Sequence, residues 1–251
     1  MPTPRLVRAV LFSLSLSMPV MAGAETVRLA NGEWAPYMSQ TLRHAGVMSH
    51  IVEEAFARQG IQVEYSFSPW KRAYEDARHG RADGTLIWGR TDEREAEFLL
   101  SDPVIELNTV LFYATDQGFD WSDTASLSDK TLGGVIGYSY GVDAEERAGL
   151  LKIERIAVPE GNYAKLLQGR IDAVLEDLDV GLDSIAKLGL GDKITYHPKP
   201  ILERPYFLLM NRINPANPAY LEAFNKGLKA LRADGSYRRM LDASRAGEYR
   251  Q

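Results

Sequence analysis

Short apolar runs alternate with amphipathic stretches along most of the chain, a pattern typical of strands and crossover helices in a mostly parallel sheet. In the first half, three apolar runs predict strands at residues 27–32, 63–68 and 83–89. Between the first two, apolar side chains recur at helical spacing at Val47, Ile51, Ala55 and Phe56. A second helix is predicted to begin with Ser68 as its N-cap and Pro69 at its first position, and to end at Gly80.

A second series of the same elements follows, with strands predicted at residues 131–137, 153–158 and 171–176 and helices near 141–150, 161–168 and 179–188. Two extended passages, residues 101–116 and 194–212, flank this series. The tail then places four apolar side chains on one helix face: Leu221, Phe224, Leu228 and Leu231. We therefore expect an α/β fold with a cleft between two lobes, joined by a two-strand hinge and made of residues 25–112 plus 207–251 and residues 113–206.

The segments GRADGTL (80–86) and GRIDAVL (169–175) nearly repeat each other. Each is interpreted as a helix ended by glycine in a left-handed turn, with a buried strand immediately after it. On this interpretation four charged residues are ordinary turn residues: Arg81, Asp83, Arg170 and Asp172. The repeat then indicates two lobes of similar construction.

The first 24 residues have the features of a cleaved export signal. Arg5 and Arg8 precede a short apolar run, and Ala22-Gly23-Ala24 forms a small-x-small cleavage site. The mature protein is therefore expected to begin near Glu25 and to work in the periplasm. The chain has no cysteine, so disulfides are excluded.

The charge balance disfavours several classes of partner. The 34 acidic residues outnumber the 29 basic ones, for a formal net charge of -5, whereas nucleic-acid binding depends on a basic surface. The four histidines are scattered without ligand spacing, so neither a metal site nor another cofactor is expected: His44, His50, His79 and His197.

Basic residues gather at the predicted carboxyl edge of the first lobe's strands, where ligands of open α/β sheets bind: Lys71, Arg72, Arg90 and Arg94. A basic side chain in the first turn of a helix faces the positive end of the helix dipole, at a cost of roughly 0.3 to 1 kcal/mol. A ligand anion would offset this cost. Arg94 is the preferred partner because its planar fork pairs with a carboxylate at two points.

The corresponding edge of the second lobe is acidic, with Glu176, Asp177 and Asp179 at the end of a predicted strand. Asp177 suits two roles, the N-cap of the next helix and a ligand-binding residue. Cations on one rim and anions on the other would suit a zwitterion. We predict that its carboxylate binds Arg94 and its ammonium group binds Asp177.

Aromatic residues lie at the same predicted strand ends and loops: Trp34, Tyr37, Trp70, Trp88, Tyr138 and Tyr140. Trp88 also suits a place in the core. Trp70 directly follows the proline that starts a helix, so it is predicted to face the cleft mouth and to stack on the ligand.

Taken together, these residues resemble the periplasmic solute-binding proteins of family 3, the amino-acid-binding components of ABC importers. GRIDAVLEDLDV (169–180) is similar to the family segment that leads into the ammonium-binding aspartate, and TDER (91–94) is similar to the one that ends in the carboxylate-binding arginine. The resemblance thus implies these roles for Asp177 and Arg94. It also implies ligand stacking by Trp34 of WAPY and by Trp70, and ligand contacts from Ser139 and Tyr140 of GVIGYSY (134–140).

One segment departs from the family pattern. LIWGR is one residue shorter than the small polar stretch that it replaces, and it places Trp88 and Arg90 where groups that bond an α-amino acid are usual. Lys71 in PWKR adds another nearby cation. These three residues join the predicted ligand-binding set, and they indicate a ligand larger or more acidic than a simple amino acid.

The resemblance implies a type II periplasmic-binding-protein fold and a monomer without enzymatic activity. Such a protein captures a small zwitterionic or anionic solute by hinge closure and delivers it to an ABC importer permease in the inner membrane. Two alternatives stay open. One is a periplasmic enzyme of the cyclohexadienyl dehydratase kind, with Glu176 as acid or base. The other is a binding protein that serves a membrane sensor.

Overall fold

The structure is a computed structural model that describes residues 25–250 of the chain. The predicted export signal at residues 1–24 lies outside the described residues. Within residues 25–250, ten strands form one sheet in the order β2-β1-β3-β10-β5-β8-β6-β7, with β4 beside β10 and β9 beside β5. No helix in this part of the chain combines the length and the apolar character needed to span a bilayer.

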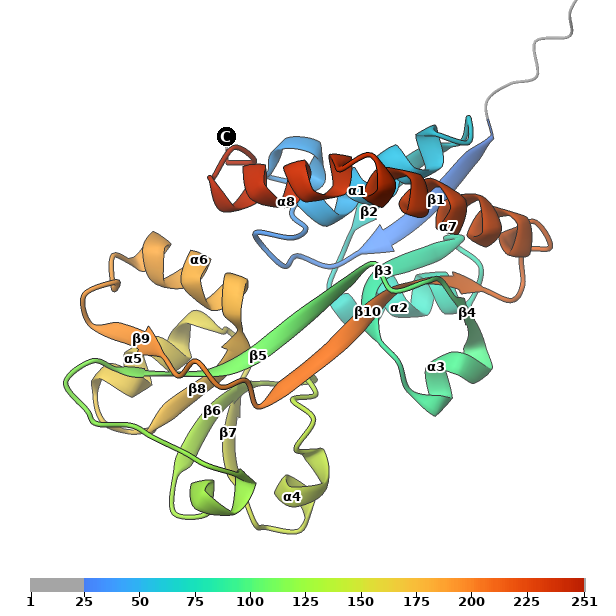
Figure 1. Cartoon of the computed structure of the whole chain (residues 1–251). Coiled ribbons are helices and arrows are strands. Elements are labelled where there is room, and N and C mark those ends of the chain that lie inside the picture. Colours follow the sequence, from blue (N-terminus) through green and yellow to red (C-terminus); the bar gives the residue numbers. More distant parts are fainter. Residues whose placement is uncertain (1–24, 251) are drawn as a thin grey trace, which may run out of the picture.

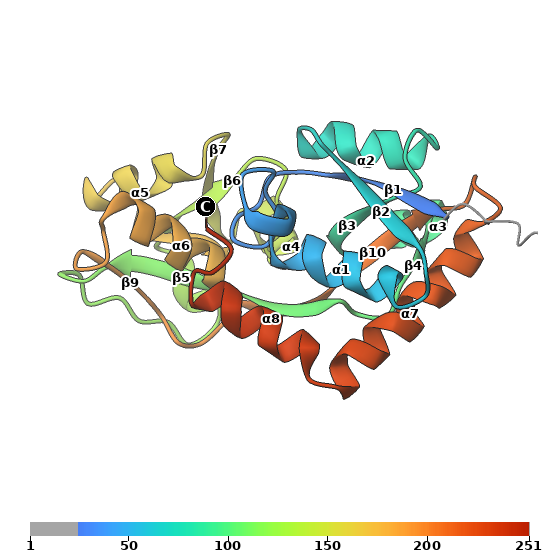
Figure 2. The same ribbon diagram turned by 90° about the horizontal axis from the view of Figure 1, so that it is seen from above.

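Lobe 1 is the part built on three parallel strands, β1 (Thr26–Asn31), β2 (Gln62–Phe67) and β3 (Gly84–Gly89). Its longer helices are α1 (Val47–Ala57), α2 (Trp70–Arg78), α7 (Asn217–Ala233) and α8 (Ser236–Arg245). Helices α1 and α7 pack together, and α2 packs on β1 and β3 (Figures 1 and 2). Shorter elements complete the lobe: η1 (Arg43–Ala45), α3 (Asp92–Glu97) and β4 (Phe98–Leu100).

Lobe 2 is the part built on β6 (Thr131–Val135), β7 (Lys152–Ile156) and β8 (Ala173–Asp177), in which β6 pairs in parallel with both neighbours. Strand β8 contributes to two cores because its successive side chains alternate between the faces of the sheet, with Val174 in one core and Leu175 in the other. The remaining elements are η2 (Thr124–Leu127), α4 (Asp143–Arg147), α5 (Glu160–Leu167), α6 (Leu178–Leu188) and β9 (Ile194–Tyr196).

Two long antiparallel strands join the lobes, β5 (Ile105–Ala114) and β10 (Leu202–Asn211). Strand β5 continues into lobe 2, where Thr109 to Phe112 pair with β8, while Tyr206 to Met210 of β10 pair with β3 in lobe 1. Figure 1 shows both strands crossing from one lobe to the other. The two-lobed α/β fold with a two-strand hinge is as predicted. The lobe limits 25–112, 113–206 and 207–251 remain our proposal.

The two copies of the sequence repeat form the same type of turn, one in each lobe. Gly80 and Gly169 both adopt a left-handed backbone, with φ of 75° and 65°. Three residues after each glycine, an aspartate accepts a hydrogen bond from the first part of the neighbouring parallel strand. Asp83 binds the Arg28 amide at 2.8 Å, and Asp172 binds the Thr131 amide at 2.7 Å. The interpretation as structural turns is therefore correct.

The predicted start of α2 is wrong by one residue. Pro69 keeps an extended backbone, with ψ of 137°, and occupies the N-cap position itself, so the helix begins at Trp70. Ser68 is therefore not the N-cap, and no side chain caps this helix. Helix α7 begins at Asn217, with a proline in its first turn, and carries the predicted apolar face.

A close approach of two backbones holds α7 against α1. A Cβ atom on Gly227 would lie 1.9 Å from the carbonyl oxygen of Ala55, so only glycine allows this packing. We expect Gly227→Ala to lower the free energy of unfolding by about 1 to 3 kcal/mol, because overpacking outweighs the higher helix propensity of alanine. Urea denaturation measures the change. Gly191→Ala is the matched control because nothing lies within 4 Å of the added Cβ, and equal stability of the two variants would contradict the prediction.

Candidate functional site

A hydrogen bond from lobe 1 reaches the acidic end of β8 in lobe 2. The Tyr37 hydroxyl donates to Asp177 at 2.8 Å and to Asp179 at 3.2 Å. Asp177 also caps α6, because its Oδ1 accepts the backbone amides of Asp179 and Val180. Its side chain therefore performs the predicted capping role and faces the junction between the lobes. Burial raises the pKa of Asp177 to about 7, although the Tyr37 and Val180 hydrogen bonds oppose the rise.

Glu176 precedes Asp177 and is only 3% exposed. Its carboxylate accepts the Asp177 amide at 2.9 Å. Burial raises the pKa of Glu176 to about 8, and the negative charges of Asp177 and Glu160 act in the same direction. Within residues 25–250, neither Glu176 nor Asp177 forms an ion pair with a basic side chain.

Arg94 extends from α3 at the edge of lobe 1. Thr91 caps this helix by accepting the Arg94 amide, and the Arg94 Nη1 donates to the Gly89 carbonyl at 2.7 Å. The guanidinium lies 4.8 Å from the centre of the Trp88 ring. Burial lowers the pKa of Arg94, and the nearby Arg204 lowers it further. Arg94 has no carboxylate within ion-pair distance in the described chain.

Arg204 on β10 is a member of this group that the sequence reasoning missed. Its Nε donates to the Tyr206 hydroxyl and its Nη2 donates to the Ser139 carbonyl, both at 3.0 Å. Like Arg94, it has no acidic partner among the described residues. The available signal was an arginine immediately before the apolar run YFLLM, inside the predicted extended return passage.

Tyr206 links the two sets of charges. Burial raises its pKa, Arg204 opposes the rise, and the negative charges of Asp177 and Glu176 add to it. Tyr206 also influences the pKa of Arg94. The structure therefore brings Arg94 and Asp177 within electrostatic reach of one tyrosine, on opposite lobes, although the two residues do not contact each other directly.

Aromatic rings line the lobe 1 side of this junction. Trp34 lies between Tyr206 and Trp70, with ring centres 5.8 and 6.4 Å away, and Trp70 meets Trp88 edge-on at 5.3 Å. The Trp70 ring covers Gly32, where a Cβ atom would lie 2.2 Å from it, and its indole donates to the Glu33 carbonyl. The Trp34 indole nitrogen is buried and has no acceptor within the described part of the chain.

Other predicted residues lie in different surroundings. Lys71 is exposed on α2, and Arg90 is exposed and pairs with Glu95 at 2.9 Å. The Ser139 hydroxyl donates to Asp143 at 2.6 Å, while its carbonyl receives Arg204. The structure does not bring these three side chains into contact with Arg94 or Asp177.

Tyr140 points into the core of lobe 2, because its hydroxyl accepts the Val135 amide at 2.8 Å and the residue is 2% exposed. Tyr138, two residues earlier, is half-buried and packs against the same core. Burial raises the pKa of both tyrosines, and the negative charge of Glu176 raises both further. Both rings therefore belong to lobe 2, on the side where β8 ends in Glu176.

The shortened LIWGR segment forms an irregular strand. Ile87 has a φ of 59°, which is rare for a β-branched residue, and the register between β3 and β10 shifts beside it. This strain of about 1 to 3 kcal/mol lies next to Trp88 and Gly89, which contact Arg94. The irregular backbone thus sets the position of the cationic group.

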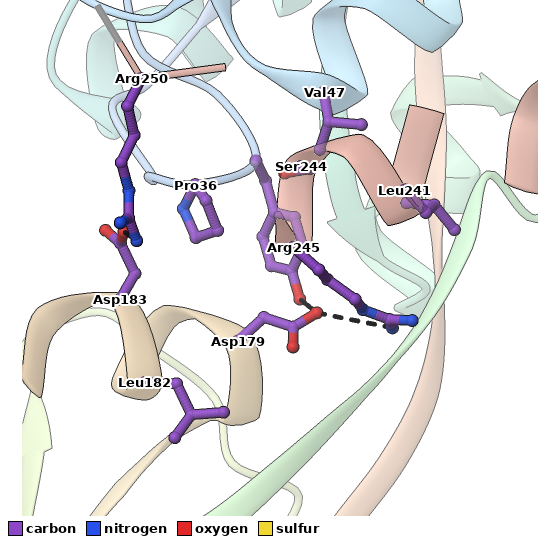
Figure 3. Close-up of a pocket in the computed structure, with 10 residues that line it drawn as sticks. Pro36, Val47, Asp179, Leu182, Asp183, Leu241, Ser244, Arg245 and Arg250 are labelled. Carbon is purple, nitrogen blue, oxygen red and sulfur yellow. Dashed lines mark hydrogen bonds and ion pairs between the residues drawn. The ribbon is translucent and has the colours of Figure 1, made fainter. Parts of the chain in front are cut away.

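A separate pocket of about 320 Å³ lies between α6 of lobe 2 and α8 of lobe 1. Two ion pairs cross it, Arg245 with Asp179 at 3.8 Å and Arg250 with Asp183 at 2.9 Å (Figure 3). Tyr37 and Asp179 line the pocket, whereas Arg94, Arg204 and Asp177 do not. These contacts hold the lobes together beside the candidate site.

Metal binding has no support in the described residues, because no group of three or more His, Asp or Glu side chains is placed to hold an ion. The site therefore offers charged and aromatic side chains for a small molecule, with cations on lobe 1 and the hinge and carboxyl groups on lobe 2.

Comparison with known proteins identifies relatives of this architecture. A sequence model of bacterial extracellular solute-binding proteins, family 3, matches residues 29–243. No curated protein sequence matches the chain.

Several solved structures share the fold. The GluR0 ligand-binding core from Nostoc punctiforme in complex with L-glutamate is 18% identical, with a TM-score of 0.70 over 86% of this chain and 97% of that one. The amino acid ABC transporter substrate-binding protein AbpA from Streptococcus pneumoniae, bound to L-arginine, is 16% identical, with a TM-score of 0.71 over 90% and 97%. An ancestral amino acid-binding protein, a precursor of cyclohexadienyl dehydratase, is 19% identical, with a TM-score of 0.69 over 86% and 94%. The predicted type II binding-protein fold is confirmed.

The raised pKa values predict a pH dependence of stability. Asp177 rises from its ordinary value of 3.8 to about 7 and Glu176 from 4.5 to about 8. The folded protein thus binds more protons than the unfolded chain between about pH 4 and 8, and its stability falls as pH rises across this range. We expect Glu176→Gln to resemble wild type at pH 5 but to melt at least about 2 to 4 °C higher at pH 9, the shift that roughly 1 kcal/mol produces.

Thermal melting of the ligand-free protein from pH 5 to 9 measures this effect. Glu222→Gln is the control because Glu222 is exposed and is not among the groups that shift the pKa of Glu176. Parallel melting curves for wild type and Glu176→Gln across this range would show that Glu176 is not held protonated by burial.

Proposed function

The chain belongs to the bacterial extracellular solute-binding proteins, family 3, and from this premise we propose that it captures a small zwitterionic or anionic solute between its lobes. An amino acid or a derivative is the expected class. The observation that supports this proposal is the set of charged groups without a counter-charge at the junction, with Glu176 and Asp177 buried and Arg94 and Arg204 half-buried. Arg94, Arg204, Glu176 and Asp177 are all hydrogen-bonded to neutral groups only.

Each charge is positioned to exchange a neutral partner for a ligand group. We assign the ligand ammonium group to Asp177, where it would take the place of the Tyr37 hydroxyl. We assign the ligand carboxylate to Arg94, whose Nε and Nη2 have no acceptor within residues 25–250. Trp34 and Trp70 would pack on the body of the ligand, and the buried Trp34 indole offers one further donor.

Closure of the hinge would complete the site. The Tyr37–Asp177 and Arg250–Asp183 contacts join the lobes, as does the bond from Arg204 to Ser139. A ligand that bridges Arg94 and Asp177 would add to these contacts and shift the equilibrium toward the closed form. We further propose that the protein works as a monomer in the periplasm after removal of residues 1–24. It would deliver its ligand to an ABC importer permease, with a membrane sensor as the other receiver.

A second candidate function rests on Glu176. A buried carboxyl group that stays protonated near neutral pH has the property of a general acid. A dehydratase acting on prephenate or arogenate would use such a group. We favour binding without catalysis because the other charges at the junction suit ligand capture.

The assigned roles predict the effect of two substitutions. We expect Arg94→Ala and Asp177→Asn each to lower the affinity for the bound solute at least tenfold. Arg94→Ala would leave the ligand carboxylate buried without a counter-charge, and Asp177→Asn would leave the ligand ammonium group in the same state. Asparagine preserves the cap of α6, so the fold should survive. The solute is first identified by mass spectrometry of the small molecules released on denaturing the purified protein, and its affinity is then measured by calorimetry.

Arg212→Ala is the control, because Arg212 is exposed and bonds only the Glu95 carbonyl. Unchanged affinity in both site variants would exclude the assignment. Formation of phenylpyruvate from prephenate or of phenylalanine from arogenate by wild type, and not by Glu176→Gln, would instead favour the enzyme.

A further inference from the structure

We infer that Arg204 is a second anion-binding residue and that the solute is an amino acid with an additional acidic group. This inference rests on the proposed function, because it concerns the ligand of the same site. It assigns one acidic group of the ligand to Arg94 and the other to Arg204.

The two guanidinium groups lie against one residue of lobe 1. Arg94 donates from Nη1 to the Gly89 carbonyl at 2.7 Å. A Cβ atom on Gly89 would lie 3.3 Å from Cζ of Arg204, so the second guanidinium lies directly on the Gly89 backbone. The positive charge of Arg204 is close enough to lower the pKa of Arg94. Two positive charges beside Gly89, which has no side chain, favour an anion at this position.

Free donors remain on both side chains. Arg204 uses Nε for Tyr206 and Nη2 for Ser139, and its Nη1 has no acceptor among the described residues. Arg155 provides the contrast within this protein. It is also partly buried, but Glu146 pairs with it at 2.7 Å and Asp143 lies 3.9 Å away. Among the half-buried arginines of residues 25–250, Arg78 and Arg155 each have a carboxylate partner, whereas Arg94 and Arg204 have none.

The balance of charge at the junction favours an acidic ligand. Arg94 and Arg204 contribute two positive charges. Asp177 contributes one negative charge when a ligand ammonium group pairs with it, whereas burial keeps Glu176 protonated near neutral pH. A neutral zwitterion would leave one half-buried positive charge without a counter-charge, which is unfavourable. A ligand with one ammonium group and two acidic groups neutralises the site.

Hinge geometry makes Arg204 suitable for selecting among ligands. It lies on β10, contacts Gly89 of lobe 1 and donates to the Ser139 carbonyl of lobe 2. Its charge therefore lies between the two lobes and can act on a ligand that binds to either lobe first. A neutral amide in place of the second acid would still bind Arg94 and Asp177 but would leave Arg204 unpaired. The same charge would oppose lysine-like ligands.

Calorimetry with four probes tests this inference: L-glutamate, L-aspartate and their amides L-glutamine and L-asparagine. We expect wild type to bind at least one of the two acids at least tenfold more tightly than its amide. In Arg204→Gln that ratio should fall close to one, chiefly through weaker binding of the acid. Arg204→Lys should restore part of the preference, because it keeps the charge without the planar fork.

The ratio is the informative quantity, because a purely structural loss of the Ser139 and Tyr206 contacts would weaken acid and amide equally. Arg212→Gln is the matched control and should keep the wild-type ratio. Equal binding of acid and amide by wild type, an unchanged ratio in Arg204→Gln, or no binding of any of the four probes would overturn the inference. A different zwitterion recovered from the purified protein, whose binding depends on Arg94 and Asp177, would leave the proposed function standing.

Discussion

Removing a charge from water without a counter-charge is costly, and the junction between the two lobes contains four groups that lack one: Glu176 and Asp177 are buried, and Arg94 and Arg204 are half-buried. Arg94 and Arg204 bond only carbonyl and hydroxyl oxygens, and Glu176 and Asp177 accept only amide and hydroxyl protons. The protein tolerates this cost partly through raised pKa values that keep the carboxyl groups less charged. A ligand with complementary charges would remove it. The unpaired charges therefore destabilise the ligand-free protein, and ligand binding would remove this unfavourable contribution.

The fold places these groups by ordinary local rules. Strand β8 ends at the junction because α6 begins there, and the cap of α6 fixes the Asp177 carboxylate. On lobe 1, the strained backbone at Ile87 turns Gly89 and Trp88 toward Arg94. The hinge strand β10 then brings Tyr206 and Arg204 between the two sets of charges.

Much of this arrangement follows from sequence because it depends on short-range signals. Glycine-ended helices, buried runs and an aspartate at a strand end predict the strands, the turns at Gly80 and Gly169 and the cap at Asp177. The predicted Arg94 and Asp177 do lie on opposite lobes near one tyrosine. Arg204 was missed because an irregular hinge strand has no clear alternation that assigns its side chains to a face.

A crystal structure of residues 25–250 with L-glutamate is the most direct test of the claim that a ligand joins the two sets of charges. We expect the ligand ammonium nitrogen within hydrogen-bonding distance of the Asp177 carboxylate, with one ligand carboxylate on the Arg94 guanidinium and the Tyr37 hydroxyl displaced. A ligand bound away from Arg94 and Asp177, with the Tyr37–Asp177 bond intact, would contradict it.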